Sequence, residues 1–464
     1  MTASLSTNSE PDVKAGRLDA SEYAARFGDA TPPMSHAEAI MEAERCLYCY
    51  DAPCQTACPT GIDVPSFIKR IADGNLRGSA KTILEANPLG GMCARVCPTE
   101  DLCEKVCVRN TQAGVPVAIG RLQRFAVDAL MHSDKPQVFT RAAATGKRVA
   151  VVGAGPAGLA CAHTLALLGH KLVVFDANPK AGGLNEYGLA SYKTPNNFAQ
   201  KEIDWLLGIG GIEIRQGWKL ETTAQLDALR NDYDALFLGM GLSDTHQLGL
   251  NGENLGGVQD AVHFIAALRQ SSDLSTLPVG RRVIVIGGGM TAVDASVQSK
   301  LLGAETVTMV YRRGPADMSS SKEEQEWAQT NGITMRHWMA PAEILSGDSS
   351  GHGNSHGHVN GVKFAKQVMK DGKLTATGEF ETLPADMVLK AIGQTLGNPV
   401  LNASGLMLED GRMVTDTHGQ TNIPGVWAGG DCRAGGLDLT VEAVEHGKRS
   451  AKAMHAYMAL AQPK

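Results

Sequence analysis

Eight of the ten cysteines lie close together in the sequence, between Cys46 and Cys107, at spacings of a few residues. Two of the eight are followed directly by proline. Thiolates repeated in this way are ligands of iron–sulfur clusters or of structural zinc, so the segment could hold two cubane clusters or two zinc ions. Zinc carries no electrons, so a redox domain beside the segment would favour clusters. The other two cysteines, Cys161 and Cys432, are predicted to pack in the interior.

A glycine-rich turn, Gly153 to Gly158, has the pattern of a dinucleotide-binding turn. It follows an apolar strand expected over 148–152 and opens an apolar helix that ends near residue 168. The glycines allow a tight turn, close approach of backbone to a pyrophosphate and packing of helix on strand, while the helix N-terminus offers N–H groups to phosphate. Asp176 follows the next strand, where a carboxylate can accept hydrogen bonds from ribose hydroxyls. The alternative is a glycine turn that binds no ligand.

A second turn of the same kind, Gly287 to Ala292, follows a strand expected over 282–286. The strand after its helix leads into Arg312 and Arg313 instead of an acid. Guanidinium groups there suit the 2′-phosphate of NADP, and the hydroxyls of residues 319–321 could add donors. The alternative is that both arginines are solvated surface charges. The pattern favours NADPH without excluding NADH.

The elements around both turns repeat one strand–turn–helix–strand unit. Each unit is followed by a later apolar strand that ends in glycine, over 235–238 and 387–392, and residues 424–428 return to the first unit. This pattern predicts an α/β fold with two Rossmann-like dinucleotide-binding domains, the second inserted in the first, preceded by an α-helical iron–sulfur domain. The expected boundaries are 1–140 for the helical domain, 146–279 and 394–464 for the first dinucleotide-binding domain, and 280–393 for the second.

Two further segments have distinct compositions. Residues 64–87 are expected to form two short helices around a turn at 73–75. Residues 346–361 are rich in Gly, Ser, His and Asn and are expected to form a surface loop. A metal site is the alternative there, because the segment contains three histidines, His352, His356 and His358.

Composition and charge exclude several classes of function. The 464 residues carry a formal net charge of −6, whereas a nucleic-acid binder normally has a basic face. No run of about 18 apolar residues is present, so no membrane span is expected. The polar N-terminus lacks the basic start and apolar centre of a signal peptide. A cytoplasmic protein is therefore expected.

The two glycine turns, together with Gly429-Gly430-Asp431, resemble flavoprotein reductases that have two dinucleotide-binding domains. The resemblance implies that the first domain holds FAD and the inserted one NADH or NADPH. The implied FAD-binding residues are Gly153, Gly155, Pro156, Ala157, Gly158, Asp176, Gly183, Leu184, Lys193, Gly430, Asp431 and Thr440. The implied coenzyme-binding residues are Gly288, Gly289, Met290, Thr291, Arg312, Arg313, Ser319, Ala391, Ile392 and Gly393. No side chain is expected to act as an acid or base, because hydride passes directly between the cofactors.

The cysteine-rich segment resembles the N-terminal domain of dihydropyrimidine dehydrogenase and, less closely, the glutamate synthase small subunit. The matching stretches are Asp51-Ala52-Pro53-Cys54, Cys58-Pro59-Thr60, Asn87-Pro88-Leu89-Gly90, Cys97-Pro98-Thr99 and 119–125. The resemblance implies that one 4Fe–4S cluster is held by Cys46, Cys49, Cys54 and Cys107. It implies that a second is held by Cys58, Cys97, Cys103 and the amide oxygen of Gln123. Cys93 is then left without a cluster.

The resemblance to the electron-input subunits of bacterial dihydropyrimidine dehydrogenases covers nearly the whole chain. It implies an enzyme that oxidises NAD(P)H at FAD and passes electrons through the clusters to an FMN-containing partner subunit, which reduces uracil or thymine. A separate partner is expected because no span of about 250 residues is left for a pyrimidine-reducing barrel. Two alternatives stay open: a glutamate synthase small subunit, against which Gln123 counts because that family tends to have an acid there, and a non-enzymatic zinc-bearing module.

Overall fold

The computed structural model describes residues 16–347 and 357–460. Its contacts divide the chain into two compact units. One comprises residues 29–186, 193–245 and the described residues from 394 onward, and the other comprises the described residues up to 28, 187–192 and those within 246–393. The predicted histidines His352 and His356 lie outside the described residues. The chain passes between the units several times, more often than the two passes that a single insertion requires.

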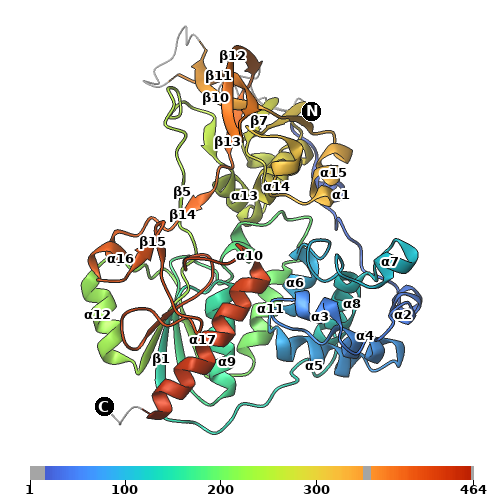
Figure 1. Cartoon of the computed structure of the whole chain (residues 1–464), viewed down its shortest axis with the longest axis vertical. Coiled ribbons are helices and arrows are strands. Elements are labelled where there is room, and N and C mark those ends of the chain that lie inside the picture. The colour runs from blue at the N-terminus through green and yellow to red at the C-terminus, as the bar shows by residue number, and fades with distance from the viewer. Residues whose placement is uncertain (1–15, 348–356, 461–464) are drawn as a thin grey trace, which may run out of the picture. The chain divides into compact units, whose positions relative to one another are not determined.

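The cysteine-rich part of the first unit is helical (Figure 1). Its helices are α2 (His36–Glu44), α3 (Pro53–Ala57), α4 (Val64–Ala72), α5 (Leu76–Ala86), α6 (Gly90–Val96), α7 (Arg109–Ala113) and α8 (Ile119–Met131). Asp63 and Asn75 cap the N-termini of α4 and α5, because each side chain accepts a backbone N–H three residues on. The prediction of two short helices around 73–75 is therefore confirmed. Apolar faces of α2, α4 and α8 form a core of their own.

A parallel sheet of order β17-β4-β1-β2-β3 forms the rest of the first unit. Its strands are β1 (Arg148–Val152), β2 (Lys171–Phe175), β3 (Ile212–Arg215), β4 (Ala235–Leu238) and β17 (Val426–Ala428). Its helices are α9 (Pro156–Leu167), α10 (Leu184–Tyr187, whose last residue falls in the other unit), α11 (Phe198–Leu207), α12 (Thr223–Asp232), α16 (Pro399–Ala403) and α17 (Thr440–Leu460). Short antiparallel pairs, β5 (Asp244–Thr245) with β14 (Gln394–Thr395) and β15 (Leu408–Glu409) with β16 (Arg412–Met413), complete it.

Helix α17 packs along α9 against one face of this sheet. A cluster that includes Leu226 and Leu229 of α12 covers the other face. The strand expected over 424–428 is confirmed as β17, which pairs with β4 and returns the chain to the first sheet. Parallel strands with helices on both faces are the architecture predicted for a dinucleotide-binding domain.

The second unit is built on another parallel sheet, of order β6-β13-β7-β8-β9. Its strands are β6 (Val258–Asp260), β7 (Arg282–Ile286), β8 (Thr306–Val310), β9 (Thr334–Arg336) and β13 (Met387–Lys390). Its helices are α1 (Ala20–Arg26), α13 (Ala261–Gln270), α14 (Met290–Leu301) and α15 (Lys322–Thr330). A three-stranded antiparallel sheet, β10 (Met339–Ser346), β11 (Val359–Lys370) and β12 (Lys373–Pro384), is attached to it.

The predicted fold class is confirmed: two Rossmann-like units are present, one inserted in the other, after a helical region. The exact domain boundaries stay a prediction. Helix α1 lies in the same unit as the second sheet, where the Tyr23 hydroxyl donates to the carbonyl oxygen of Leu302 at 3.5 Å. In the part of the chain that the structure describes, no helix is long and apolar enough to cross a membrane.

Candidate functional site

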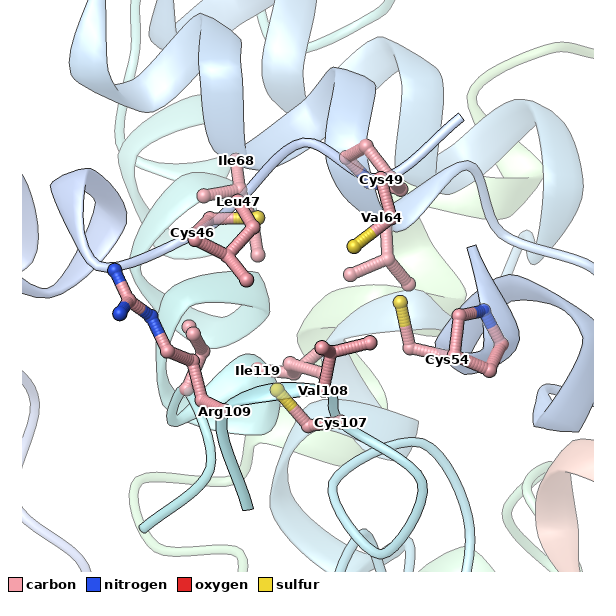
Figure 2. A pocket seen from close by; sticks show the side chains of 13 residues that line it. Cys46, Leu47, Cys49, Cys54, Val64, Ile68, Cys107, Val108, Arg109 and Ile119 are labelled. Carbon is pink, nitrogen blue, oxygen red and sulfur yellow. The ribbon is translucent and has the colours of Figure 1, made fainter. Parts of the chain in front are cut away.

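Four cysteines surround a cavity in the helical region (Figure 2). They are Cys46, Cys49, Cys54 and Cys107, the first set implied by the sequence. Apolar side chains, among them Val64 and Ile68 of α4 and Ile119 of α8, line the rest of the cavity. Thiolates around an apolar cavity are the donor set of an iron–sulfur cluster, so these residues fit the group.

Two thiols of this first set lie in surroundings that raise their pKa. Burial raises the pKa of Cys54 to about 11, and the neighbouring Cys46 and Cys107 add to the rise. Burial likewise raises the pKa of Cys46. Among the described residues, no three His, Cys, Asp or Glu side chains come close enough to bind one metal ion. The four thiols are thus too far apart to bind a single ion and instead line a cavity.

A second group of thiols lies next to the first. Burial raises the pKa of Cys97 well above its ordinary value, and the neighbouring thiols of Cys93, Cys103 and Cys58 raise it further. Cys54 and Cys58 lie within and directly after the short helix α3, so this helix connects the two groups. Burial is the main cause of the raised pKa of Cys103, and the neighbouring Cys58 and Cys54 thiols raise it further.

Gln123, the one non-cysteine member of the implied set, is buried on α8. Its amide nitrogen donates to the carbonyl oxygen of Gly90 at 2.7 Å. A carbonyl oxygen can only accept, so this bond fixes which end of the amide is nitrogen. The amide oxygen makes no hydrogen bond to a residue that the structure describes, which leaves it available as a ligand. Cys93, in contrast, is fully buried in α6.

The first glycine turn joins β1 to α9 in the expected way. Gly153 has a φ of +100°, and a Cβ there would overlap the carbonyl oxygen of Gly239 at the end of β4. A Cβ on Gly158 would overlap the carbonyl oxygen of Gly153. The Asp176 carboxylate accepts hydrogen bonds from the backbone of Ala154 at 2.6 Å and of Asn178 at 2.8 Å. Asp176, which was predicted to bind ribose hydroxyls, thus also holds the backbone of the turn in place.

Two other segments border this turn. The backbone N–H of Gly182 donates to Ala154 at 2.8 Å, which brings Gly183 against Gly155. At the start of α17, the Thr440 hydroxyl donates to the Asn185 side-chain oxygen at 2.8 Å. The structure thus gathers the implied FAD-binding residues of the turn, the loop at 181–185 and α17 at the carboxyl end of the sheet, where ligands bind in this architecture.

Asp431 follows Gly430, which has a φ of +76° and donates its N–H to the His446 ring at 3.2 Å. Burial raises the pKa of Asp431 to about 6, and the neighbouring Asp438 adds to the rise. A hydrogen bond donated by a hydroxyl group would stabilise the ionised form of this buried carboxylate. Lys193 opens the stretch of chain that returns to this unit.

The second turn joins β7 to α14. A Cβ on Gly288 would lie 2.6 Å from the Tyr311 ring, and a Cβ on Gly289 would lie 3.0 Å from the Ser319 hydroxyl. The Ser320 hydroxyl and N–H both approach the Gly288 carbonyl oxygen at 3.1 Å. This places the segment around residue 319 beside the turn, and β13 leads Ala391 to the same place, because its N–H donates to Ile286 at 2.8 Å.

The two arginines predicted to bind phosphate are exposed after β8. Arg313 approaches the Tyr311 hydroxyl at 3.5 Å. Arg312 forms no ion pair with any described residue. Met290 and Thr291 open α14, and Gly393 has a φ of +100°. The ligand assignments for both nucleotide sites and both clusters stay predictions, made more specific by this geometry.

Two family comparisons match successive parts of the chain. The family described as pyridine nucleotide-disulphide oxidoreductase matches residues 147–447. The chain belongs to the pyridine nucleotide-disulphide oxidoreductase family. The family described as dihydropyrimidine dehydrogenase domain II, 4Fe-4S cluster, matches residues 23–135. This member of the oxidoreductase family is thus an NAD(P)H-dependent flavoprotein with 4Fe–4S clusters.

Curated relatives of nearly equal length have two different names. The glutamate synthase [NADPH] small chain of Escherichia coli K12 is 33% identical over 446 residues, which cover 92% of each chain. The NAD-dependent dihydropyrimidine dehydrogenase subunit PreT of Salmonella typhimurium LT2 is 33% identical over 433 residues, 93% of this chain and 97% of that one. The predicted relationship to electron-input subunits is confirmed, and identity alone does not separate the two names.

Solved structures support the oxidoreductase fold. Mycobacterium tuberculosis FprA in complex with NADPH has a TM-score of 0.55 at 20% identity, covering 68% of this chain and 84% of that one. Lactococcus lactis thioredoxin reductase has a TM-score of 0.51 at 21% identity, covering 68% and 99%. These likenesses concern the fold alone.

Several contacts between the cysteine-rich helices and α11 involve residues that the sequence did not single out. Glu202 of α11 binds the start of α6, and the Arg95 guanidinium lies 3.4 Å over the Phe198 ring. Their sequence neighbours give little signal, because Glu202 lies between Lys201 and Asp204 in what resembles an ordinary surface helix. The contacts join residues more than 100 positions apart.

Proposed function

We propose that this chain is the electron-input subunit of a cytoplasmic dihydropyrimidine dehydrogenase. It oxidises NADH or NADPH and supplies electrons to a separate FMN-containing subunit that reduces uracil or thymine to the 5,6-dihydro forms. The observation that carries the proposal is the placement of Gln123, with its amide nitrogen on Gly90 and its oxygen unbonded among the described residues. The matching family model for dihydropyrimidine dehydrogenase domain II supports it.

Two sets of side chains would hold the clusters. The first is Cys46, Cys49, Cys54 and Cys107, and the second is Cys58, Cys97, Cys103 and Gln123. The sets alternate along the chain, so each cluster would tie the start of the segment to its end. These residues would hold the groups that supply the redox chemistry: FAD would provide the acceptor for the hydride of NAD(P)H, and the clusters would provide one-electron carriers.

In the flavin site, the groups of the protein would bind and orient FAD. Backbone N–H groups at the start of α9 would donate to the pyrophosphate, and the absence of a side chain on Gly155 would allow its close approach. Asp431 would accept a hydrogen bond from a ribityl hydroxyl, and the start of α17 at Thr440 would face the ring. These groups need no proton transfer, since position alone governs hydride passage.

The coenzyme site would use the α14 N-terminus for the pyrophosphate and Gly393 near the nicotinamide. Arg312 and Arg313 would bind a 2′-phosphate beside Ser319, which favours NADPH.

The second candidate, a glutamate synthase small chain, is favoured by the E. coli relative of that name. One experiment separates the two. The chain is purified with a candidate FMN-containing subunit, and oxidation of NADH and NADPH is followed after addition of uracil or of glutamine with 2-oxoglutarate. Oxidation that depends on uracil is expected. If neither coenzyme is oxidised when uracil is added, the pyrimidine assignment fails.

A further inference from the structure

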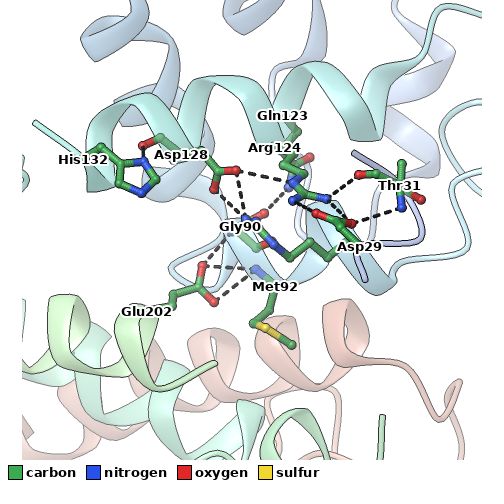
Figure 3. A network of polar contacts seen from close by, with 11 residues as sticks. Asp29, Thr31, Gly90, Met92, Gln123, Arg124, Asp128, His132 and Glu202 are labelled. Carbon is green, nitrogen blue, oxygen red and sulfur yellow. Dashed lines mark hydrogen bonds and ion pairs between the residues drawn. The ribbon is translucent and has the colours of Figure 1, made fainter. Parts of the chain in front are cut away.

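A carboxylate of the flavin domain reaches into the cluster-bearing helices. Glu202 lies on α11 and is fully buried. Its carboxylate accepts hydrogen bonds from the backbone N–H groups of Gly91 at 2.6 Å and Met92 at 3.2 Å (Figure 3). These are free donors at the start of α6, the helix that carries Cys93 and is followed directly by Cys97. The bonds therefore join the flavin domain to a cluster-bearing element.

The same turn is held from its other side by the proposed ligand Gln123. Its amide nitrogen binds Gly90, the residue directly before Gly91. There is no space for a side chain between the two, because a Cβ on Gly91 would lie 2.5 Å from the Phe198 ring and 2.7 Å from Glu202. Two consecutive residues are thus bound by a proposed cluster ligand and by a flavin-domain carboxylate.

Arg95 adds a buried positive charge beside this turn. Its guanidinium lies 3.4 Å over the Phe198 ring and donates to the Gly91 carbonyl oxygen at 3.0 Å. It also donates to both carboxylate oxygens of Asp128, at 2.7 and 2.9 Å. Asp128 lies on α8, the helix that carries Gln123, and its side chain also contacts Arg124 at 3.4 Å. The arginine thereby links α6 to α8 and to the flavin domain, two positions before Cys97.

We propose that Glu202 and Arg95 are positioning residues that fix α6 against the flavin domain and set the reduction potential of the cluster on Cys58, Cys97, Cys103 and Gln123. This inference rests on the ligand set given under the proposed function. Fixed charges act strongly where water is excluded, and charge and hydrogen bonds near a cluster set its potential. A positive charge favours the reduced cluster, and a negative charge favours the oxidised one.

The effect of Glu202 on the reduction potential of the cluster should depend on pH. Burial raises the pKa of Glu202 to about 8, against the lowering effect of the two backbone N–H groups and of Arg95. Asp128 of α8 also acts on it, and Glu202 in turn acts on the Cys93 thiol of α6. Glu202 therefore ionises as the pH rises through about 8, which adds a negative charge and lowers the potential of the nearby cluster.

The test is a redox titration of the isolated full-length holoprotein, followed by low-temperature EPR at pH 7 and pH 9. In the wild type, one of the two clusters is expected to have a lower potential at pH 9 than at pH 7. Glu202→Gln should remove this difference, and Arg95→Met should lower the same potential at both pH values. The matched control is Asp204→Asn, an exposed carboxylate on the same helix, which should behave as the wild type.

Equal potentials in all variants, or equal shifts of both clusters, would overturn the inference. If Arg95→Met loses iron, Arg95→Gln is measured instead: retained iron with a potential below that of the wild type at both pH values supports the inference, and a wild-type potential contradicts it. The outcomes remain distinct from those of the proposed function. A wild type without uracil-dependent activity still gives a readable titration, whereas a wild type without 4Fe–4S signals refutes the ligand set itself.

Discussion

At the scale of single residues, Cys54 and Cys93 are two buried or half-buried thiols with different expected roles. Cys54 borders the cavity of the first set, whereas Cys93 lies inside α6. Cys54→Ser should lose one cluster, which is about half of the iron, because hydroxyl oxygen is a poor substitute for thiolate. Cys93→Ser should keep both. Iron and acid-labile sulfide per chain are measured after anaerobic purification, and loss of a cluster from Cys93→Ser would refute the ligand set.

Asp431→Asn should stabilise the protein without flavin and weaken its binding of FAD. Its pKa is raised to about 6, so its contribution to stability is greatest below pH 4 and is lost as the pH rises through about 6. Asp431→Asn should therefore stabilise the apoprotein at pH 7, by about 1–2 kcal/mol, since a pKa unit corresponds to about 1.4 kcal/mol and partial exposure reduces the effect. FAD affinity should fall instead. Thermal melts of apoprotein at pH 5 and pH 7, with FAD titration, test both signs.

Arg312 and Arg313 should determine the choice of coenzyme. Both are exposed beside the second turn, and a hydrogen bond to a charged group contributes about 1.5–3 kcal/mol. Replacing both by alanine should raise the KM for NADPH roughly tenfold or more and leave that for NADH nearly unchanged. Arg281→Ala is the control, because this exposed arginine is paired with Glu305. Steady-state reduction of ferricyanide by each coenzyme gives the values, and equal changes for both coenzymes would contradict the role.

At the scale of elements, two glycines of the β1–turn–α9 unit have different expected roles. Gly158 is needed for packing, and Gly155 is expected to be needed for FAD binding. A Cβ on Gly158 would overlap Gly153, whereas a Cβ on Gly155 has its nearest neighbour, Gly183, at 3.8 Å. Gly158→Ala should destabilise the protein by about 1–3 kcal/mol through overpacking. Gly155→Ala should fold normally and bind FAD more weakly, because the methyl group would lie at the predicted pyrophosphate site. Melting temperature and FAD affinity are compared for both variants, and a stable Gly158→Ala protein would contradict the packing argument.

The same scale shows what the sequence could predict. The strands at 148–152 and 282–286 match β1 and β7, because a run of apolar residues before glycines is a local signal. The second turn is predicted to run to Ala292, whereas α14 already begins at Met290, so the helix starts inside the predicted turn. The role of Glu202 could not be predicted. Its partners Gly91 and Met92 lie 110 or more positions away, and only tertiary packing brings them together.

At the scale of the whole molecule, the helical region and the flavin domain share a core. Leu84 of α5 and Leu130 of α8 pack in the same cluster as Val149 of β1 and Leu159 of α9. Ile68, in contrast, belongs to the core of the helical region itself. The two regions should therefore unfold together instead of separately, although they were predicted as separate domains.

A pair of cavity-forming variants tests this shared core. Leu84 and Ile68 are 1% and 0% exposed, so each substitution by alanine should cost about 2–5 kcal/mol. Leu84→Ala should lower the temperature of flavin release, although the residue lies outside the flavin domain, because it removes contacts to the core that supports β1 and α9. Ile68→Ala should lower the temperatures of cluster loss and of flavin release together, because the two regions unfold as one. Flavin fluorescence and cluster absorbance are followed during heating; if Leu84→Ala loses clusters while the flavin stays bound at the wild-type temperature, the two regions are independent.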